Sequence, residues 1–276
     1  MRVWFITGAS RGFGALIAKE ALDAGDAVVA TARNPQTVTD RLGRHPNLLA
    51  VALDVTDEAQ ANAAAADAVK RFGKIDILIN NAGYGLLGAV EEASAAEIEA
   101  LYRTNVFGLL AVTRAVLPYM RRERSGHILN LSSVGGYSAF QGWGVYGSTK
   151  FAIEGLTEAL ALELAPLGIH ATAIEPGFFR TDFLDETSLA ISPHQIPDYR
   201  DTSGAMRSFA ADANHAQPGD PVKLAEVLVD FAGSANPPVR LPLGSDTVAA
   251  IEAKDASTAA ILKQWRAVSV STDFAA

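Results

Sequence analysis

Short apolar runs alternate along this chain with longer segments in which apolar residues recur every three or four positions. The runs cover residues 3–7, 27–31, 48–53, 75–80, 127–131 and 169–175, and a seventh candidate covers 239–243. Several, such as 75–80, are apolar almost throughout, which is typical of strands covered on both faces. Short strands that alternate with helices predict repeated βαβ units and a parallel sheet.

Polar residues mark where several of the predicted helices begin. Ser94-Ala95-Ala96-Glu97 is a capping box that opens a helix running towards Pro118. Asp220 followed by Pro221 combines an N-cap with proline at the first helical position. Because no internal repeat, low-complexity linker or block of like charges interrupts the pattern, we expect residues 1–276 to form one domain.

Two stretches depart from this rhythm. Residues 178–219 contain prolines 193, 197 and 218 and few periodic apolar positions. A connection of this length inside a compact domain is usually functional, so we expect a substrate lid with few fixed apolar anchors. Residues 245–276 predict a helical extension capped by Ser245. This extension could cover the sheet edge or a neighbouring subunit, and the sequence does not choose between the two.

Composition removes several classes of function. The 276 residues include 23 Lys+Arg and 31 Asp+Glu, a net charge of −8 that argues against a nucleic-acid-binding surface. No apolar run approaches the roughly 18 residues that span a bilayer, and no signal peptide is recognisable. The chain has no cysteine, and its five histidines are not spaced as metal ligands on one helix. We therefore expect a cytoplasmic protein that uses neither metal nor thiol and binds neither nucleic acid nor membrane.

A glycine-rich loop, Thr7–Gly14, lies between the first predicted strand and the first predicted helix. Gly8 permits a tight turn, Gly12 lets the backbone approach a pyrophosphate, and Gly14 lets helix and strand pack closely. The N-terminus of the helix then offers free N–H groups to an anion. The spacing is Gly-x3-Gly-x-Gly, which differs from the Gly-x-Gly-x-x-Gly of two-domain dehydrogenases.

Three further motifs follow in order: Asn80-Asn81-Ala82-Gly83, Tyr146-Gly147-Ser148-Thr149-Lys150 and Pro176-Gly177. Together with the glycine loop, they resemble the single-domain short-chain dehydrogenase/reductases from residue 3 to about residue 182. The resemblance implies a single Rossmann-type α/β domain, with a doubly wound parallel sheet of about seven strands and helices on both faces. It also implies oxidoreduction with a nicotinamide coenzyme.

The resemblance further implies which residues contact that coenzyme. Asp54 and Val55 would lie at the adenine, and the motifs after Asn81 would surround the ribose and nicotinamide. Asp54 could instead cap the helix after Thr56, and Asn81 could only tie strands together. The complete set from the resemblance is Gly8, Ser10, Arg11, Gly12, Phe13, Gly14, Asp54, Val55, Asn81, Gly83, Tyr146, Lys150, Pro176, Gly177, Phe179 and Thr181.

The end of the second strand bears on the choice of coenzyme. An NAD-preferring site usually has an acid there for the ribose hydroxyls, but this chain has Ala32 followed by Arg33. Arg33 and Arg11 suit a 2′-phosphate, because a guanidinium holds phosphate through paired N–H bonds. The sequence therefore predicts NADP(H), with NADPH as the reduced cofactor.

Tyr146 and Lys150 lie four residues apart, on one face of a predicted helix. We expect the Lys150 ammonium to lower the pKa of the Tyr146 phenol, which would then exchange a proton with the substrate oxygen. Ser133, thirteen residues before Tyr146, would hydrogen-bond the same oxygen. Strand alternation turns neighbouring Ser132 to the opposite face. Through the resemblance, Asn105 is the fourth catalytic residue and positions a water.

These features favour an NADPH-dependent carbonyl reductase or alcohol dehydrogenase. An isomerase or dehydratase, and a non-catalytic coenzyme sensor, are the alternatives. Aromatic and apolar residues on the loops suggest a hydrophobic small-molecule substrate, such as a steroid, a retinoid or an aryl ketone: Phe140, Trp143, Phe178, Phe179, Phe183, Tyr199 and Met206. The helix after Tyr146 is apolar nearly all round, which predicts a homo-oligomer (dimer or tetramer) or, alternatively, a helix buried within one chain.

Overall fold

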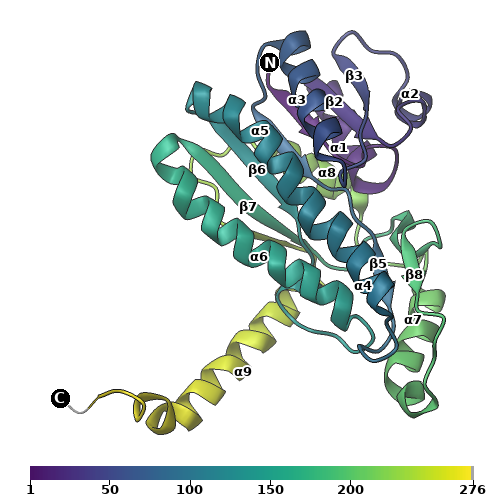
Figure 1. Cartoon of the computed structure of the whole chain (residues 1–276), viewed down its shortest axis with the longest axis vertical. Helices are drawn as coiled ribbons and strands as arrows, with labels where there is room; N and C mark the ends of the chain where they lie inside the picture. The colour runs from purple at the N-terminus through teal and green to yellow at the C-terminus, as the bar shows by residue number, and fades with distance from the viewer. Residues whose placement is uncertain (275–276) are drawn as a thin grey trace.

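The seven predicted strands form one parallel sheet in the computed structural model, which describes residues 1–274 (Figure 1). The order across the sheet is β3-β2-β1-β4-β6-β7-β9, so the prediction of a parallel sheet is confirmed. The strands are β1 (Val3–Ile6), β2 (Ala27–Ala32), β3 (Leu48–Ala52), β4 (Ile77–Asn80), β6 (Gly126–Leu131), β7 (Ile169–Pro176) and β9 (Arg240–Leu243).

The direction of winding reverses between β1 and β4. The chain moves outward from β1 through β2 to β3, and then returns to place β4 on the other side of β1. In an open parallel sheet, this reversal leaves a crevice at the carboxyl ends of the two central strands, where ligands bind. The glycine loop leaves β1 and the Asn81 motif leaves β4 at that crevice.

Helices cover both faces of the sheet and enclose two apolar layers. On one face, α1 (Gly12–Asp23), α2 (Gln36–Leu42) and α8 (Pro221–Phe231) pack against side chains such as Trp4 and Ile6. On the other face, α3 (Glu58–Phe72), α5 (Leu109–Glu123) and α6 (Gly144–Leu164) pack against Phe5 and Ile128. Because alternate residues of each strand face opposite layers, nearly every strand position is apolar.

The helix predicted to start at Ser94 is interrupted by a wider turn. The capping box is present, with the Ser94 and Glu97 side chains each accepting a backbone N–H. After α4 (Ala95–Tyr102), the chain forms a π-helix over Arg103–Gly108 before continuing as α5. The helix also passes Pro118 and ends at Glu123, so the predicted end is wrong.

Helix α6 presents one face to the sheet and one to the outside. Tyr146, Lys150 and Ile153 are buried, whereas Leu162 is 80% exposed. The alternative that α6 is buried all round within one chain is therefore wrong. The predicted N-cap of α8, Asp220, is confirmed. The terminal helix has Gly244 as its N-cap, one residue before the predicted Ser245.

Residues 178–219 have more structure than the sequence predicts. They contain β8 (Leu189–Ile191), which pairs in parallel with β5 (Gly85–Leu87), and α7 (Ala205–Ala213). Leu189 and Ala210 are the buried apolar residues of this segment, which agrees with the expectation of few fixed apolar anchors. An isolated bridge between Phe179 and Gly219 brings its two ends together.

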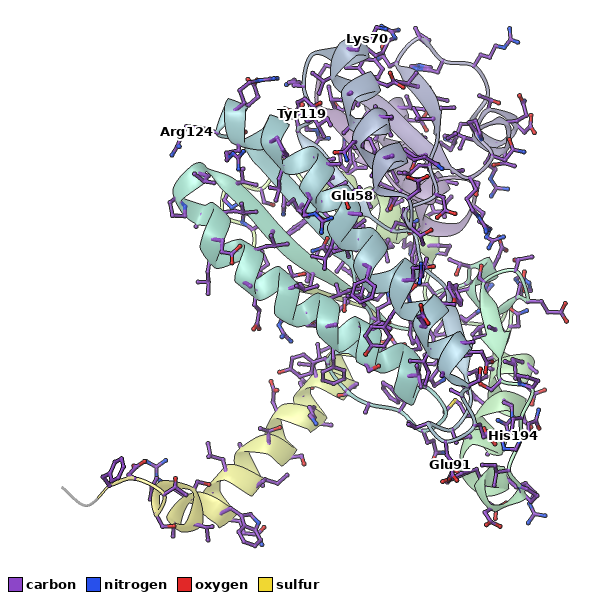
Figure 2. All side chains as sticks on the ribbon, in the orientation of Figure 1. Glu58, Lys70, Glu91, Tyr119, Arg124 and His194 are labelled. Atoms are coloured by element: carbon purple, nitrogen blue, oxygen red, sulfur yellow. The ribbon has the colours of Figure 1, made fainter. Side chains whose placement is uncertain are left out.

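Helix α9 (Ser245–Val270) projects away from the rest of the chain, and beyond Asp255, which accepts the Tyr137 hydroxyl, its side chains stand clear of the other elements (Figures 1 and 2). The sequence left open whether the extension covers the sheet edge or a neighbouring subunit. Only the first turns of α9 contact the edge strand β9, so the extension does not cover the sheet edge. Residues 275 and 276 of the predicted extension lie outside the described residues. No helix among residues 1–274 is both long and apolar enough to cross a membrane.

Candidate active site

A single large cavity of about 1110 Å³ lies at the crevice between the carboxyl ends of β1 and β4. One end is lined by the glycine loop, the middle by Ser133 and Tyr146, and the far end by the segment that contains Phe183 and Met206. The coenzyme residues implied by the sequence line this cavity, with the exception of Gly14. The fold thus brings together motifs that are spread over most of the chain.

The conformation of the glycine loop explains its sequence. Gly8 and Gly12 have φ angles of +66° and +54°, which favour glycine. A Cβ at Gly14 would lie 2.4 Å from the Gly8 carbonyl oxygen, so no other residue fits there. A Cβ at Gly12 would meet nothing within 4 Å, which leaves the backbone open to the cavity. This open turn at the start of α1 fits a pyrophosphate.

Asn81 holds the glycine loop against β4. Its side-chain amide donates to the carbonyl oxygens of Thr7 (2.9 Å) and Gly8 (3.1 Å). The Thr7 hydroxyl in turn accepts the backbone N–H groups of Asn81 and Ala82. Asn81 therefore ties the two strands together, which was the alternative role considered for it, and it also lines the cavity.

Ala32, Arg33, Asp54 and Val55 line the cavity beyond the glycine loop. Asp54 accepts the backbone N–H and the hydroxyl of Thr56, at 2.9 and 2.7 Å. Helix α3 is capped by Asp57, so the alternative that Asp54 caps it is wrong. Arg33 is exposed, whereas the Arg11 guanidinium donates to the backbone carbonyl of Thr187 in the segment opposite.

Tyr146 and Lys150 share one buried face of α6. The Lys150 ammonium donates to the Leu131 carbonyl oxygen at 2.7 Å and lies 5.6 Å from the centroid of the Tyr146 ring. An ammonium has three donors, so this bond leaves others for a ligand. Ser133 caps a short turn by accepting the backbone N–H of Gly135 at 3.0 Å, and its hydroxyl still has a donor.

Burial decides the acidity of this pair. It raises the pKa of Tyr146 above the ordinary 10, with only a partial opposing effect from the Ser133 hydroxyl. Burial also lowers the pKa of Lys150 to about 8. Contrary to the expectation, the pKa of Tyr146 is therefore not lowered in this structure, because burial removes water from the phenol. Tyr146 is consequently a neutral phenol with a proton to donate.

Asn105 lies within the π-helix and behind the cavity wall. Its amide donates to the Tyr84 carbonyl (3.0 Å) and accepts the Tyr84 N–H (3.1 Å). It also donates to the Thr149 hydroxyl at 3.3 Å, next to Lys150 on α6. A π-turn inside an α-helix is common at functional sites, and here it turns a polar side chain into the core. Asn105 itself does not line the cavity in the described chain.

Aromatic side chains form the wall around the Tyr146 hydroxyl. Trp143 and Phe183 pack against the Tyr146 ring, with centroids 5.5 and 5.6 Å away. Phe179 packs edge-on against Phe13 at 5.5 Å, which links the Pro176-Gly177 loop to the glycine loop. Of the predicted substrate residues, Phe140, Trp143, Phe178, Phe179, Phe183 and Met206 line the cavity, while Tyr199 does not.

Glu92 anchors the segment over the cavity, a role that the sequence analysis missed. Its buried carboxylate accepts the Arg207 guanidinium and the Ala89 N–H, both at 2.7 Å, and the Ile196 N–H at 2.9 Å. These bonds lower the pKa of Glu92 to about 2. Glu91, next to it, is exposed and accepts the Tyr199 hydroxyl; Glu91 and His194 lie together at the outer end of this region (Figure 2).

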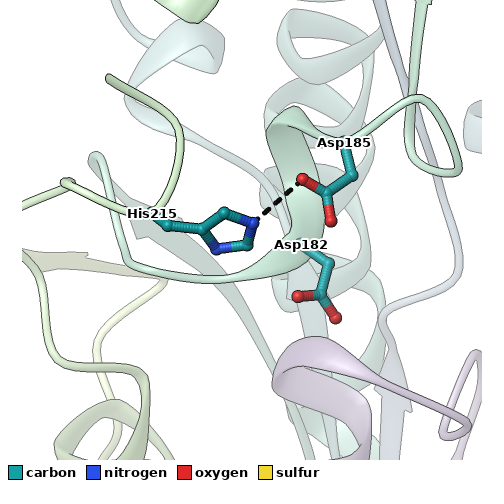
Figure 3. A group of neighbouring side chains, drawn as sticks. All are labelled: Asp182, Asp185 and His215. Carbon is teal, nitrogen blue, oxygen red and sulfur yellow. Dashed lines mark ion pairs between the residues drawn. The ribbon is translucent and has the colours of Figure 1, made fainter. Parts of the chain in front are cut away.

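A second polar group, Asp182, Asp185 and His215, lies at the base of the same segment (Figure 3). His215 Nε2 is 3.2 Å from Asp185 Oδ1, which also accepts the Asn214 amide at 2.6 Å. These contacts link the first and last parts of residues 178–219. We therefore interpret Asp182, Asp185 and His215 as a structural contact that holds this segment together.

Comparisons with known proteins agree with the geometry of the site. Residues 2–191 match the family model described as "short chain dehydrogenase". The chain is 37% identical to "Oxidoreductase BOA17" of Botryotinia fuckeliana, over 98% of this chain and 99% of that protein. It is 36% identical to a "3-ketodihydrosphingosine reductase" of Bacteroides thetaiotaomicron, over 88% of each chain.

Solved structures give the same result. A short-chain dehydrogenase from Streptomyces avermitilis superposes with a TM-score of 0.92 at 40% identity, and 99% of each chain is covered. A structure described as "ElxO with NADP Bound" superposes with a TM-score of 0.74 at 29% identity, covering 90% of this chain and 99% of that one. The fold and the cavity are thus of a kind that holds a nicotinamide coenzyme in related proteins.

Proposed function

Because this chain belongs to the short-chain dehydrogenase family of oxidoreductases, we propose that it transfers hydride between NADP(H) and the carbonyl group or secondary alcohol of a hydrophobic substrate. One observation supports this most directly. A neutral phenol, Tyr146, lies in an apolar cavity beside the Ser133 hydroxyl and above the Lys150 ammonium. A carbonyl oxygen that is being reduced requires a proton donor and a hydrogen-bond donor, and Tyr146 and Ser133 can supply these.

In the reductive direction, Tyr146 donates its proton to the substrate oxygen. The Ser133 hydroxyl donates a hydrogen bond to the same oxygen and stabilises the negative charge that develops there. The coenzyme supplies the hydride. Lys150, whose ammonium lies 5.6 Å from the phenol ring, stabilises the phenolate that remains until a proton returns. Asn105 holds the Tyr84 backbone and Thr149 in place around these groups.

The adenosine end of the cavity supports NADP(H) rather than NAD(H). Ala32 offers no carboxylate to ribose hydroxyls, and the exposed guanidinium of Arg33 lines the cavity directly after it. Arg11 lies within the glycine loop, and its remaining N–H groups are available to a phosphate. A 2′-phosphate would neutralise two positive charges there.

The far end of the cavity supports a hydrophobic substrate. Trp143, Phe183 and Met206 contribute apolar surface, and the segment 178–219 covers them as a lid. The relative named as a 3-ketodihydrosphingosine reductase would act on a ketone with a long apolar chain, which is the kind of substrate that this wall favours. Exposed apolar residues on α6, among them Phe151 and Leu162, support a homo-oligomer.

The proposal is tested by a panel of carbonyl compounds and secondary alcohols. Steroid, retinoid, aryl and long-chain 3-keto compounds are offered with NADPH and then with NADH, and coenzyme absorbance is followed. We expect turnover with apolar ketones and NADPH, and none in Tyr146→Phe. NADPH binding without turnover of any member would instead indicate the coenzyme sensor.

A further inference from the structure

Two buried acids lie behind the catalytic face of α6. Glu154 on α6 and Glu175 on β7 are 2% and 0% exposed. None of their four carboxylate oxygens accepts a hydrogen bond from any residue among 1–274. Leaving a buried carboxylate without donors costs several kcal/mol, so ionised side chains would not normally occupy these positions. Some feature of the site must lower this cost.

The charges around the two acids do not balance if every acid is ionised. Arg240 on β9 lies 3.6 Å from Glu154 and 3.6 Å from Glu175, but only 2.8 Å from the more exposed Glu158. One guanidinium therefore faces three carboxyl groups. Its opposite side contacts the ring of Tyr137, whose hydroxyl donates to Asp255 on α9. The only other cation beside the pair in the described chain is Lys150, one turn before Glu154.

A proton between the two acids resolves the imbalance. Burial raises the pKa of both Glu154 and Glu175, and the negative charge of Glu154 raises the pKa of Glu175 further. The Ser132 hydroxyl and Arg240 oppose this shift at Glu154. Two carboxyl groups in contact attract one another only when one of them is protonated, as in other carboxyl pairs that share a site.

The charge of the pair reaches Lys150. Burial lowers the Lys150 pKa to about 8, while the negative charge of Glu154 raises it. A change in the protonation of the pair therefore changes the electrostatic potential at the ammonium. Glu158 lies one further turn along α6 and bonds Arg240 at the surface, so its charge is screened by water.

We propose that Glu154 and Glu175 share one proton at neutral pH and act as positioning residues for Lys150. When the pH rises, this proton passes to water, and the second negative charge then keeps Lys150 in its ammonium form. The pair thus extends the pH range over which the site holds a cation beneath Tyr146. The shared proton rests on the burial of the pair, its lack of hydrogen-bond donors and its single guanidinium, whereas its effect on turnover rests on the proposed function.

The shared proton is tested without any activity. Free energies of unfolding are measured with urea between about pH 6 and pH 7.5, where a glutamate in an unfolded chain is ionised and Lys150, with its pKa of about 8, still holds most of its proton. Because the folded pair holds an extra proton, unfolding of the wild type releases about one proton, which is seen as a dependence of the free energy of unfolding on pH. Unfolding of Glu154→Gln or of Glu175→Gln does not release this proton. Glu158→Gln, on the same helix and the same arginine, is the matched control and behaves as wild type. Equal proton release in wild type and both pair variants would overturn the proposal.

The effect on Lys150 is tested by the pH dependence of NADPH affinity and, where a substrate is found, of kcat/KM. Glu154→Gln removes the negative charge beside Lys150, so the alkaline loss of affinity and turnover moves down by about one pH unit. Glu158→Gln leaves the alkaline loss of affinity and turnover at the pH of the wild type. An unchanged alkaline limb in Glu154→Gln would refute the positioning role even if the proton is shared. If no carbonyl compound turns over, the proposed function fails. The unfolding measurements and the NADPH affinity still decide whether the pair shares a proton and acts on Lys150.

Discussion

Replacing Glu92 by glutamine removes the charge at a buried anchor between the body of the protein and the proposed lid, residues 178–219. The carboxylate accepts two charge-assisted bonds from Arg207 and Ala89 on one oxygen, and the Ile196 N–H on the other. Glutamine keeps a single acceptor oxygen and places an NH₂ group where the second oxygen was. In one orientation that group faces Arg207 and the Ala89 N–H, and in the other it faces the Ile196 N–H and the second Arg207 nitrogen, which lies 3.4 Å from that oxygen. In both orientations the buried guanidinium loses its counter-charge.

The magnitude follows from burial. The Glu92 side chain is fully buried and Arg207 is 13% exposed, so water replaces little of what is lost. Breaking a buried ion pair costs about 3–5 kcal/mol, and the lower value applies because Ile196 can keep its acceptor. About 3 kcal/mol corresponds to an increase of roughly 100-fold in the population of the opened lid.

Hydrogen exchange measures this population directly. Amides of α7 and of residues 196–204 should lose about two decades of protection in Glu92→Gln, while the strands of the sheet keep theirs. Glu91→Gln is the matched control: Glu91 is exposed and its bond to Tyr199 contributes at most about 1 kcal/mol.

Acid should have the same effect as the mutation. The pKa of Glu92 is lowered to about 2, so its stabilising effect is complete above the ordinary pKa of 4.5 and is lost as the pH falls towards 2. Protection of the lid in the wild type should therefore decrease over that range, and in Glu92→Gln it should not. Equal protection of the lid in wild type and Glu92→Gln at neutral pH would refute the anchor.

Three further variants test the active site. Tyr146→Phe should reduce kcat by at least about 10²-fold and leave NADPH binding nearly unchanged, as seen by coenzyme fluorescence; near-normal kcat would remove Tyr146 from the mechanism. Arg33→Ala should lower kcat/KM for NADPH about 10- to 100-fold and leave NADH unaffected, and adding Ala32→Asp should favour NADH further; an unchanged ratio of the two coenzymes would count against a 2′-phosphate site. Gly14→Ala should abolish coenzyme binding, because its Cβ would lie 2.4 Å from the Gly8 carbonyl oxygen; retained affinity by titration would show that the loop can shift.

The sheet and its order could be predicted because their causes are local in the sequence. Apolar runs such as Ile77–Asn80 and glycines at Gly8 and Gly12 each require one particular backbone, and four motifs in order identify one topology. The cavity residues came from the family resemblance of those motifs, and their position agrees with parallel strands that end at one edge of the sheet. Local signals failed at the helix after Ser94, because nothing in the pattern shows the π-turn that carries Asn105.

The electrostatics of the site depend on partners far apart in the chain. Glu92 and Arg207 are 115 residues apart, and neither has a neighbour that reveals its partner. The raised pKa of Tyr146 arises from burial by Trp143 and Phe183, which a spacing rule does not report. A signal did exist for Glu154, which is an acid on the otherwise apolar face of α6, but its partner on β7 could be found only in three dimensions.

The bond between Asp246 and the Phe178 N–H, 2.7 Å long, has a consequence for biosynthesis. Asp246 lies in the first turn of α9 and so close to Gly177 that a Cβ there would be 2.2 Å from its carboxylate. The two partners are 68 residues apart, which takes a ribosome about 3 to 14 seconds to synthesise. During that time the loop after β7 has no acceptor for its N–H, so one wall of the cavity remains unfixed. A nascent chain can therefore pair the strands from β1 to β7 before it can bind coenzyme tightly, and the site matures only with β9 and the last helix.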